Sequence, residues 1–494
     1  MLGFSVGNIG EILLNRGLLT KEQISVVVKH QKKTDRLFGQ VALGLGFLKE
    51  DDLLTVLSEL YAAEIVSLEF VYTDKETLMS VPCDTAVACS AVPFFINEEC
   101  VKIAVADPGN LRAVDAMTAY FKGKKAEFFI AKESEILRFL EIMKCNGENI
   151  EKDPLLLMNK IIFDAVEAGA SDVHFEPCEN LVRVRIRVDG VLRVLQSVDP
   201  DAWMRMKSKL KLISGLNITE NRRPQSGHTR IYLAGKTMDL RISVHPGIFG
   251  ENFVIRIFDL SQGICSLSEL GFPDEDLLWL KRVVSFPCGI FLIVGPTGSG
   301  KTTTLYSLLK EINSSSVNIM TLEDPVEYRV DGVKQLDLRE EGLLSFSDGI
   351  RSILRQDPDV MLIGEIRDEA TAATAVRASL TGRLVLATLH AATPTEGIRR
   401  LSDLGLKLSD FVPSLIGIFS QRLVRRFGNN GYTGRFPLTE YIYFSEELKK
   451  TLIETGDISA CRVDKSFKDS SEEALKNNFT DEKEIARVLG NADL

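Results

Sequence analysis

The sequence lacks the features that mark membrane-spanning, exported and zinc-ribbon proteins. It has no run of 18 or more apolar residues, which excludes a transmembrane helix of ordinary length. Its first residues, MLGFSVGNIGEILLNRG, have neither the basic start nor the cleavage site of a signal peptide. None of the eight cysteines forms a CxxC pair, so no structural zinc is expected. Scattered thiols without an export signal indicate reduced cysteines in the cytoplasm.

The chain also has fewer basic than acidic residues. The chain has 59 Lys and Arg against 69 Asp and Glu, which gives a formal net charge of −10. This balance argues against general nucleic-acid binding, since such proteins carry a basic footprint. The length of 494 residues predicts about three or four domains.

One segment carries a specific chemistry. The apolar run Ile290 to Val294 predicts a buried strand, a helix is expected from Thr302, and the residues between them match GxxxxGK[ST]. Glycines there let backbone N–H groups turn toward a phosphate at the positive end of the helix. Lys301 is expected to reach the β- and γ-phosphates, and Thr302 to hold Mg²⁺. The sequence therefore predicts an ATP-type site made of Gly295, Pro296, Thr297, Gly298, Ser299, Gly300, Lys301, Thr302 and Thr303.

Carboxylates follow two further apolar strands. The run that ends at Leu322 leads into Glu323 and Asp324, and the run Val360 to Ile363 leads into Gly364-Glu365. In this fold class, the strand corresponding to Val360 to Ile363 usually ends in an Asp-Glu pair. Here the pair is Gly364-Glu365, so Glu365 is the one carboxylate left to polarise the attacking water. Glu323 or Asp324 is expected to assist the metal. A third strand, 384–389, ends at His390, positioned like a sensor of the γ-phosphate.

The N-terminus contains an internal duplication. Setting Gly10 on Gly39 gives a shift of 29 residues, and Gly17 then falls on Gly46. Each half predicts a short helix, a glycine turn and a longer amphipathic helix. Thr20 and Gln23 form a capping box at the first longer helix.

Between the duplication and the phosphate loop, two kinds of sequence alternate. Short strands at 100–105 and 127–130, mixed with helices, predict a small α/β adaptor. LVRVRIRVDGVLRVL then alternates with period two about Asp189-Gly190, which is a strong hairpin signal. A second hairpin, HTRIYLAGKTMDLRISV, places Arg241 beside Asp239 on its polar face. The arginines of these strands either form a solvated sheet face or reach a triphosphate on a neighbouring subunit, a task that suits a guanidinium.

Taken together, the motifs resemble the ATPases of type II secretion and type IV pilus assembly. The resemblance rests on ordered landmarks: SDVHFEP, RVDG, RRPQSG, DLRIS, GENFVIRI, GPTGSGKTTTLY, TLEDPVEY, RQDPDVMLIGEIRD, LTGRLVLATLH, QRLVRR and GYTGR. It implies a multidomain α/β chain: a helical tandem repeat (1–65), a small α/β adaptor (66–148), a PAS-like α+β domain (149–262) and a RecA-like P-loop ATPase domain (263–494).

The resemblance also implies roles for single residues. Lys301 and Thr302 would bind ATP and Mg²⁺, Glu365 would be the catalytic acid of the second strand, and Glu323 and His390 would belong to an acidic and a histidine box. Arg222 and Arg241 fall where the family places arginines that contact nucleotide across or within a ring.

The N-terminal duplication resembles the tandem cyclic di-GMP-binding domain of these ATPases. That family's half-motif begins with an arginine and closes with a glutamine, which contact the ligand. Here Asn8 and Leu37 replace the arginines, and Gln31 is retained while Leu60 replaces its counterpart. We therefore expect the fold to be kept and cyclic di-GMP binding to be weakened, with Arg36, one place early, as a shifted substitute.

Other positions depart from the family pattern as well. Arg383 replaces a histidine, Ser226 an aspartate and Ala370 a glutamate, and the four-cysteine zinc loop of many relatives is shortened to Phe427–Gly431 without cysteine. Since the phosphate loop and Glu365 are intact, we expect ATP and Mg²⁺ as cofactors, no zinc, and an active ATPase.

The leading prediction is a hexameric motor at the cytoplasmic face of the inner membrane that drives pseudopilus assembly for type II secretion. Its expected partners are copies of itself, an inner-membrane platform protein and a cytoplasmic-facing anchor protein. A type IV pilus extension motor is the near alternative. A regulatory ring that binds nucleotide with little turnover, and a DNA-transport ATPase, are alternatives from other classes.

Overall fold

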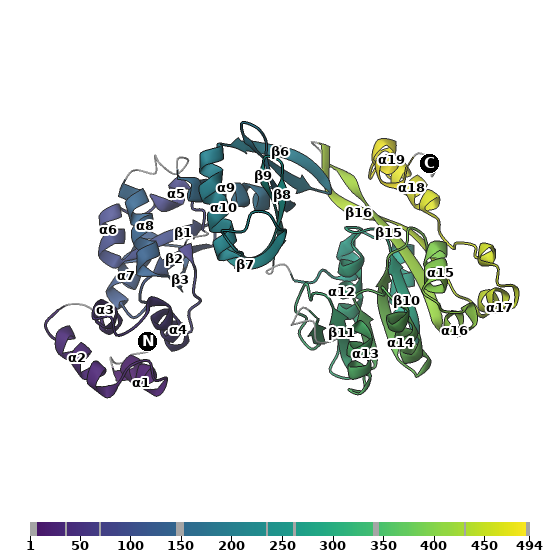
Figure 1. The fold of residues 1–494 in the computed structure, drawn as a ribbon, viewed down its shortest axis with the longest axis horizontal. Coiled ribbons are helices and arrows are strands. Elements are labelled where there is room, and N and C mark those ends of the chain that lie inside the picture. Colours follow the sequence, from purple (N-terminus) through teal and green to yellow (C-terminus); the bar gives the residue numbers. More distant parts are fainter. Residues whose placement is uncertain are drawn as a thin grey trace. The chain divides into compact units, whose positions relative to one another are not determined.

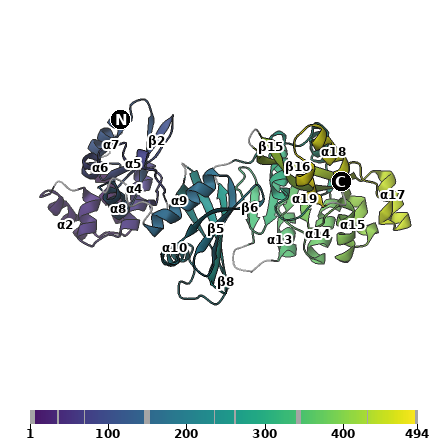
Figure 2. The same ribbon diagram turned by 90° about the horizontal axis from the view of Figure 1, so that it is seen from above.

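The computed structural model divides the chain into two compact units, residues 1–261 and residues 262–494 (Figures 1 and 2). The structure describes residues 7–34, 37–68, 71–144, 153–233, 236–259, 263–338, 345–428 and 431–490.

The first unit begins with the duplicated helices. These are α1 (Gly7–Asn15), α2 (Lys21–Gln31), α3 (Phe38–Gly44) and α4 (Glu50–Tyr61). The two glycine turns have the same backbone conformation, with φ of 69° at Gly17 and 70° at Gly46, a region that glycine enters without strain. Thr20 and Gln23 form the expected capping box at the start of α2. The predicted repeat of short helix, turn and longer helix is confirmed in the backbone.

A three-stranded sheet follows, in the order β1-β2-β3, with β1 antiparallel and β3 parallel to β2. Its elements are α5 (Lys75–Leu78), α6 (Cys83–Cys89), β1 (Ala91–Ile96), β2 (Cys100–Val105), α7 (Leu111–Tyr120), β3 (Lys125–Ile130) and α8 (Glu133–Lys144). An isolated bridge from Ile65 to Ile130 joins the chain after α4 to the edge strand β3. This layer contains the strands that the sequence predicts for the adaptor.

The third part of this unit is a six-stranded antiparallel sheet in the order β6-β5-β4-β9-β8-β7. Its elements are α9 (Pro154–Glu167), β4 (Ala170–Pro177), β5 (Val182–Val188), β6 (Val191–Val198), α10 (Pro200–Ile213), β7 (Gln225–Leu233), β8 (Lys236–Gly247) and β9 (Gly250–Asp259). Asp189 and Gly190 both have positive φ, as the predicted hairpin turn requires. Alternate residues of β5 are buried against α9 and α10, where Trp203 stacks on Phe175 at 4.7 Å between ring centroids.

The second unit is built on a seven-stranded sheet in the order β12-β11-β13-β14-β10-β15-β16. All neighbouring strands are parallel except the edge pair β15 and β16. The strands are β10 (Gly289–Val294), β11 (Ile319–Glu323), β12 (Lys334–Asp337), β13 (Val360–Ile363), β14 (Leu384–Leu389), β15 (Leu415–Gly428) and β16 (Gly431–Tyr443).

Helices cover both faces of this sheet (Figure 1). They are η2 (Leu267–Leu270), α11 (Asp274–Val283), α12 (Lys301–Ile312), α13 (Phe346–Leu354), α14 (Glu369–Leu380), α15 (Pro394–Asp403), α16 (Leu408–Phe411), η3 (Val412–Ser414), α17 (Glu446–Thr455), η4 (Ile458–Ala460), α18 (Phe467–Lys476) and α19 (Glu482–Leu489). Every residue of β10 is buried. Ile290, Leu292 and Val294 pack into one core, and Phe291 and Ile293 into the core on the other face. This two-sided burial explains why the central strand reads as a continuous apolar run.

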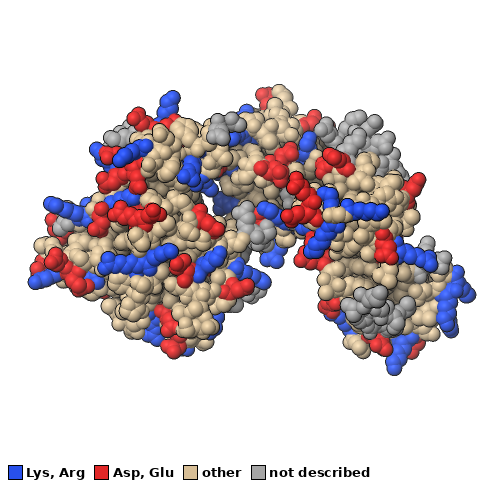
Figure 3. All heavy atoms as spheres, turned by 180° about the vertical axis from the view of Figure 1, so that it is seen from behind, with Lys and Arg blue, Asp and Glu red and all other residues tan. Residues whose placement is uncertain are grey.

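On the face shown in Figure 3, basic and acidic side chains are interspersed over the described surface. Among the described residues, no helix combines the length and the apolar character needed to cross a bilayer.

Candidate active site

The second unit brings the predicted chemical residues to one edge of its sheet. Because β10, β11, β13 and β14 are parallel, their carboxyl ends lie at the same edge. The phosphate loop follows β10, Glu323 ends β11, Glu365 follows β13 and His390 follows β14. Ligands of open α/β sheets bind at this edge, where the connecting loops leave a crevice.

The phosphate loop needs its glycines for their backbone conformation. Gly295, Gly298 and Gly300 have φ of 149°, 79° and 88°. Gly300 precedes the first residue of α12, so the backbone N–H groups of the loop and of the first helical turn face the ligand side. Thr302 lies in that turn and is half-buried.

Lys301 bends back over the loop. Its Nζ donates hydrogen bonds to the carbonyl oxygens of Gly295 at 2.8 Å and Pro296 at 2.9 Å. Burial lowers the pKa of Lys301, the negative charge of Glu365 partly offsets this, and Arg422 lowers the pKa further. The ammonium group is therefore held on the loop and interacts electrostatically with Glu365, which follows β13.

Glu365 is the centre of a charged cluster. One carboxylate oxygen is 2.8 Å from His390 Nε2, and the other accepts a hydrogen bond of 2.6 Å from Arg367 Nε. Arg367 Nη1 is also 3.4 Å from Asp324 Oδ2. The side chain of Glu365 is only 17% exposed, whereas those of Arg367 and His390 are about half exposed. Arg367 thus links Glu365 to Asp324, while His390 contacts Glu365 directly; the sequence motif includes Arg367 but does not indicate this role.

Glu323 lies apart from this cluster. Its carboxylate is 3% exposed and accepts hydrogen bonds from the hydroxyls of Tyr306 and Thr321 and, at 3.3 Å, from Gln335 Nε2. Burial raises its pKa, and these hydrogen bonds lower it in part. To reach a metal beside Thr302, this side chain would have to give up contacts that it makes in the core.

The described residues contain no group of three or more His, Cys, Asp or Glu side chains placed to hold a metal ion. For Mg²⁺ with a nucleotide, this is compatible with the usual arrangement, in which the protein offers one or two oxygens and phosphates and waters supply the rest. Thr302, half-buried, and Asp324, 38% exposed, fit that pattern of oxygen ligands.

Gln421 is a residue that the sequence analysis missed. It lies on β15, is 1% exposed, and its amide clamps the phosphate loop from the side. Nε2 donates to the carbonyl oxygen of Ser299 at 2.6 Å, and Oε1 accepts from the Thr304 hydroxyl at 2.9 Å. A Cβ on Gly300 would lie 2.8 Å from the same amide, so the loop packs tightly on it. Gln421 is part of the motif QRLVRR, but that motif does not predict a contact with the phosphate loop more than 100 residues earlier in the chain.

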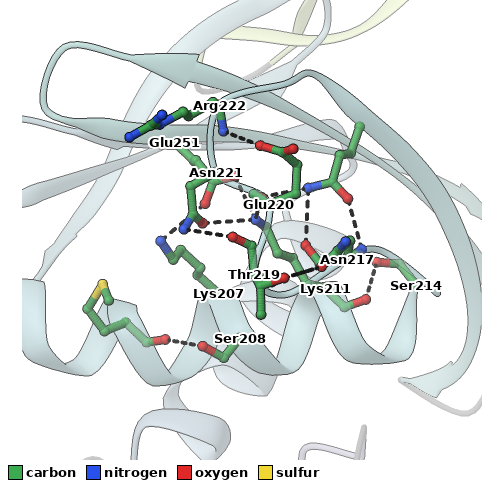
Figure 4. A network of polar contacts seen from close by, with 12 residues as sticks. Lys207, Ser208, Lys211, Ser214, Asn217, Thr219, Glu220, Asn221, Arg222 and Glu251 are labelled. Carbon is green, nitrogen blue, oxygen red and sulfur yellow. Dashed lines mark hydrogen bonds and ion pairs between the residues drawn. The ribbon is translucent and has the colours of Figure 1, made fainter.

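Arg222 lies on a loop of the first unit that is fixed by a buried ion pair (Figure 4). The side chain of Lys211 is fully buried, 2.6 Å from Glu251 Oε1, and its Nζ donates to the carbonyl oxygen of Glu220 at 2.7 Å. Glu220 Oε1 in turn accepts a 2.7 Å hydrogen bond from the backbone N–H of Arg222. The loop is therefore anchored while Arg222 itself is exposed.

Arg241 is more enclosed. Its guanidinium carbon lies 4.2 Å from the centroid of the Phe258 ring, and its Nε is 3.7 Å from Asp239 Oδ2. Its side chain is 25% exposed. Arg241 and Asp239 are close together as predicted, and Phe258 of β9 packs against the guanidinium.

The positions that depart from the family pattern lie in several elements of both units. Arg383, just before β14, donates to the carbonyl oxygen of Thr381 at 2.9 Å and lies 3.7 Å from Asp357. Ser226 is exposed on β7, and Ala370 is exposed in the first turn of α14. At the shortened zinc loop, Phe427 and Tyr432 stack with ring centroids 5.1 Å apart; residues 429 and 430 of that loop lie outside the described residues.

At the N-terminal repeat, Leu37 is the residue before α3, Leu60 lies in α4 and Gln31 ends α2. Asn8 is in α1, and Arg36, the suggested substitute, falls outside the described residues.

A family model described as type II/IV secretion system protein matches residues 149–487. The chain belongs to this family. With the family, the RecA-like fold and the assignment as an ATP hydrolase that the sequence predicts are confirmed. A second model, described as the MshEN domain, matches residues 59–144 of this secretion ATPase. That range contains the α/β layer predicted as an adaptor, and nearly all of the helical duplication lies before it.

Several relatives of known name belong to secretion and pilus assembly systems. The type IV pilus assembly ATPase PilB of Myxococcus xanthus is 35% identical over 451 residues, which cover 85% of this chain and 80% of that protein. The type II secretion system protein E of Xanthomonas campestris is 35% identical over 381 residues, or 69% and 67% of the two chains. A putative type II secretion system protein E of Escherichia coli is 41% identical over 301 residues, or 60% and 61%.

Solved structures show the same fold. The pilus retraction motor PilT with bound ADP is 27% identical with a TM-score of 0.50, over 66% of this chain and 95% of that one. The ATPase DotB of Legionella pneumophila, 23% identical with a TM-score of 0.57, covers 67% of this chain and 95% of its own.

Proposed function

We propose that this secretion ATPase is a hexameric motor that couples ATP hydrolysis to pseudopilus assembly for type II protein secretion. The observation that carries the proposal is the meeting of Lys301, Glu365 and His390 at one sheet edge, in a chain of this family. The motor would act at the cytoplasmic face of the inner membrane, attached through a platform protein and an anchor protein.

In this proposal the side chains have separate tasks. Lys301 would exchange its bonds with the loop carbonyls for phosphate oxygens, since an anion competes well with a carbonyl for an ammonium. Glu365 would accept the proton of the attacking water, while His390 and Arg367 hold its two oxygens. When bound, Mg²⁺ would neutralise phosphate charge. Its protein ligands would be Thr302 and Asp324, and Glu323 would support the end of β11 from the core.

Two substitutions test these assignments. Glu365→Gln should still bind ATP and turn over at least ~10²-fold more slowly, because the amide cannot accept the proton. Lys301→Ala should lose nucleotide affinity instead. Calorimetry with ATP and a phosphate-release assay separate the two effects. Glu311→Gln, an exposed change at the end of α12, is the matched control and should leave both readings unchanged. Near-normal turnover in Glu365→Gln would remove that residue from the chemistry.

Extension of type IV pili is a second candidate for the driven process. The pilus assembly ATPase of Myxococcus xanthus matches a larger share of this chain, 85%, than the secretion relative of Xanthomonas campestris, 69%. Disrupting the gene distinguishes the systems, because a secretion motor leaves exoproteins inside the cell and a pilus motor removes surface pili. Neighbouring genes for a secretin and pseudopilins would favour secretion.

A regulatory ring with little turnover is the candidate of another class, motivated by Arg383, Ser226 and Ala370. Purified protein that binds ATP and releases no phosphate above the Glu365→Gln background would favour the ring over the motor.

Arg222 and Arg241 are proposed to complete the nucleotide site of a neighbouring subunit. An added arginine is worth about 10³ to 10⁵ in rate in related chemistry, because it neutralises charge that one lysine leaves on the γ-phosphoryl group. The enclosed Arg241 supports this role, since a preorganised guanidinium loses little freedom on binding, and the anchored loop fixes the backbone from which Arg222 extends.

Mixing two inactive variants tests this role. Arg241→Ala and Glu365→Gln should each be inactive alone, and a mixture should recover part of the activity, since some interfaces then pair an intact arginine with an intact glutamate. Activity of the mixture should rise steeply with protein concentration as rings assemble. No recovery at any ratio, in rings shown to exchange subunits, would place Arg241 within its own site or outside the chemistry.

A further inference from the structure

A cavity of about 230 Å³ lies inside the first unit, between its three-stranded and six-stranded sheets. Phe94 and Phe95 of β1 line one wall, and Phe163 and Glu167 of α9 line another. Tyr232 of β7 also lines it. The cavity thus touches both layers of the unit, and it is independent of the nucleotide site.

Aromatic rings make up much of the lining. The rings of Tyr72 and Phe163 have centroids 4.9 Å apart and are tilted by 46°. Those of Phe94 and Tyr232 are 5.6 Å apart and meet nearly edge to face, at 81°. The faces of such rings carry negative electrostatic potential and attract cations placed within about 6 Å of the centroid.

Two carboxylates share this lining. Asp74 is held at the start of α5, where its oxygens accept hydrogen bonds from the backbone N–H of Thr77 at 2.7 Å and from its hydroxyl at 2.8 Å. Glu167 is the last residue of α9 and is exposed, and no other described residue forms a hydrogen bond or an ion pair with its carboxylate. The carboxyl end of a helix adds partial negative charge at this point. Both features favour a cation over an anion or a neutral ligand.

An ammonium of the chain lies near two of these rings, where Lys102 Nζ also donates a hydrogen bond to the Tyr232 hydroxyl. Lys102 Nζ lies 5.0 Å from the centroid of Tyr232 and 5.6 Å from that of Phe95, on a part of the surface outside the cavity lining. Glu64 and Glu127 line that neighbouring surface together with Lys102, and the positive charge of Lys102 helps to lower the pKa of Glu127 there.

From the rings and the two carboxylates, we infer that the cavity binds a primary alkylammonium group at the boundary between the two sheets of the first unit. The group would come either from a free alkyl amine or from a lysine side chain of a partner protein. Both have the same chemistry: a short aliphatic stem for the rings and a charged head for Glu167 and Asp74.

The experiment compares pentylammonium with pentan-1-ol, which has nearly the same shape and no charge. Both are titrated into the full-length protein by calorimetry or by ligand-observed NMR. Pentylammonium should bind about tenfold more tightly than the alcohol, as expected for a partly desolvated cation over aromatic rings. Glu167→Gln should reduce this preference about threefold, which corresponds to the free energy of an exposed ion pair. Phe163→Leu should reduce it further while the cavity still accepts the alcohol.

Alcohol binding shows that a variant is folded, and Glu179→Gln, an exposed change outside the lining, should keep the full preference. Equal affinity for ammonium and alcohol, no binding of pentylammonium, or a preference that survives both lining variants would overturn the inference. A second pair of probes identifies the source of the group. Tighter binding of 1,5-diaminopentane assigns the site to a free amine, and tighter binding of Nα-acetyl-lysine methylamide assigns it to a lysine side chain.

Discussion

Gln421 holds the phosphate loop from a strand that the loop motif does not include. Its amide joins the Ser299 carbonyl to the Thr304 hydroxyl, so the loop and the first turn of α12 share one buried partner. A nucleotide site depends on the loop holding its shape before the ligand arrives, because ordering it on binding would reduce affinity.

We expect Gln421→Leu to weaken ADP binding about tenfold and to lower the free energy of unfolding by roughly 2 kcal/mol, since it leaves a buried carbonyl without its donor. Calorimetry with ADP and denaturant unfolding measure the two effects. Gln356→Leu, at an exposed position after α13, is the control. An unchanged affinity for ADP in a destabilised Gln421→Leu protein would limit the residue to a structural role.

The residues of the site differ in how far sequence predicts them. Lys301 and Glu365 follow strands whose apolar runs are visible in the chain, so their place at the sheet edge could be expected. The pairing of Glu365 with Arg367 and the clamp by Gln421 depend on side-chain geometry and on long-range packing, which local patterns do not encode. The orientation of Glu323 toward Tyr306 is of the same kind: the sequence places the carboxylate at the strand end and leaves its direction open.

At the scale of elements, patterns with a local cause were predicted well. The Asp-Gly turn, the capping box at α2 and the apolar strand β10 each follow from a few neighbouring residues. The packing of α18 and α19 against the β15–β16 hairpin could not be predicted, because it depends on apolar contacts between distant segments and, for α19, on an ion pair between residues 59 positions apart in the chain.

That ion pair holds α19 against β15. Glu484 in α19 is 1% exposed, and Arg425 on β15 donates to its carboxylate through Nε at 3.0 Å and Nη2 at 2.6 Å. Arg487, one turn later, donates to both oxygens of the same group. Burial alone would raise the pKa of Glu484, and the hydrogen bonds from Arg487 and Arg425 outweigh burial and lower the pKa to about 2.

We expect Glu484→Gln to lower the free energy of unfolding of the second unit by about 3 kcal/mol, because the buried carboxylate that pairs with Arg425 and Arg487 is lost. Since the pKa is lower in the folded protein, the carboxylate contributes its full stability above pH 4.5 and loses it as the pH falls toward 2. The acid unfolding of the variant should therefore depend less on pH in this range. Glu482→Gln, exposed on the same helix, should behave as wild type. Equal acid profiles for Glu484→Gln and wild type would contradict the assignment.

Across the whole chain, the N-terminal repeat is the segment whose ligand contacts depart most from its family. Leu37 and Leu60 have replaced an arginine and a glutamine, and a cavity beside the second half contains the carboxylates of Glu50, Asp107 and Glu133. Burial raises the pKa of Asp107, a sign that this carboxylate is shielded from water. The cavity holds only about 20 Å³, far less than a dinucleotide needs.

We predict that cyclic di-GMP binds the full-length protein with a Kd weaker than ~10 μM, because like charges and lost polar contacts both oppose an anionic ligand. Calorimetry at fixed salt measures this, with ATP binding to the same sample as the control for intact protein. Submicromolar binding would contradict the prediction and direct attention to Arg36.

The long strand β15 carries both Gln421, which hydrogen-bonds to the phosphate loop, and Arg425, which pairs with Glu484 of α19. The helix α19 is therefore connected, through a single strand, to the phosphate loop. A fusion tag that strains the C-terminus should therefore weaken nucleotide binding in an otherwise folded sample. Proteolysis that removes roughly the final twenty residues should have the same effect, because it removes α19.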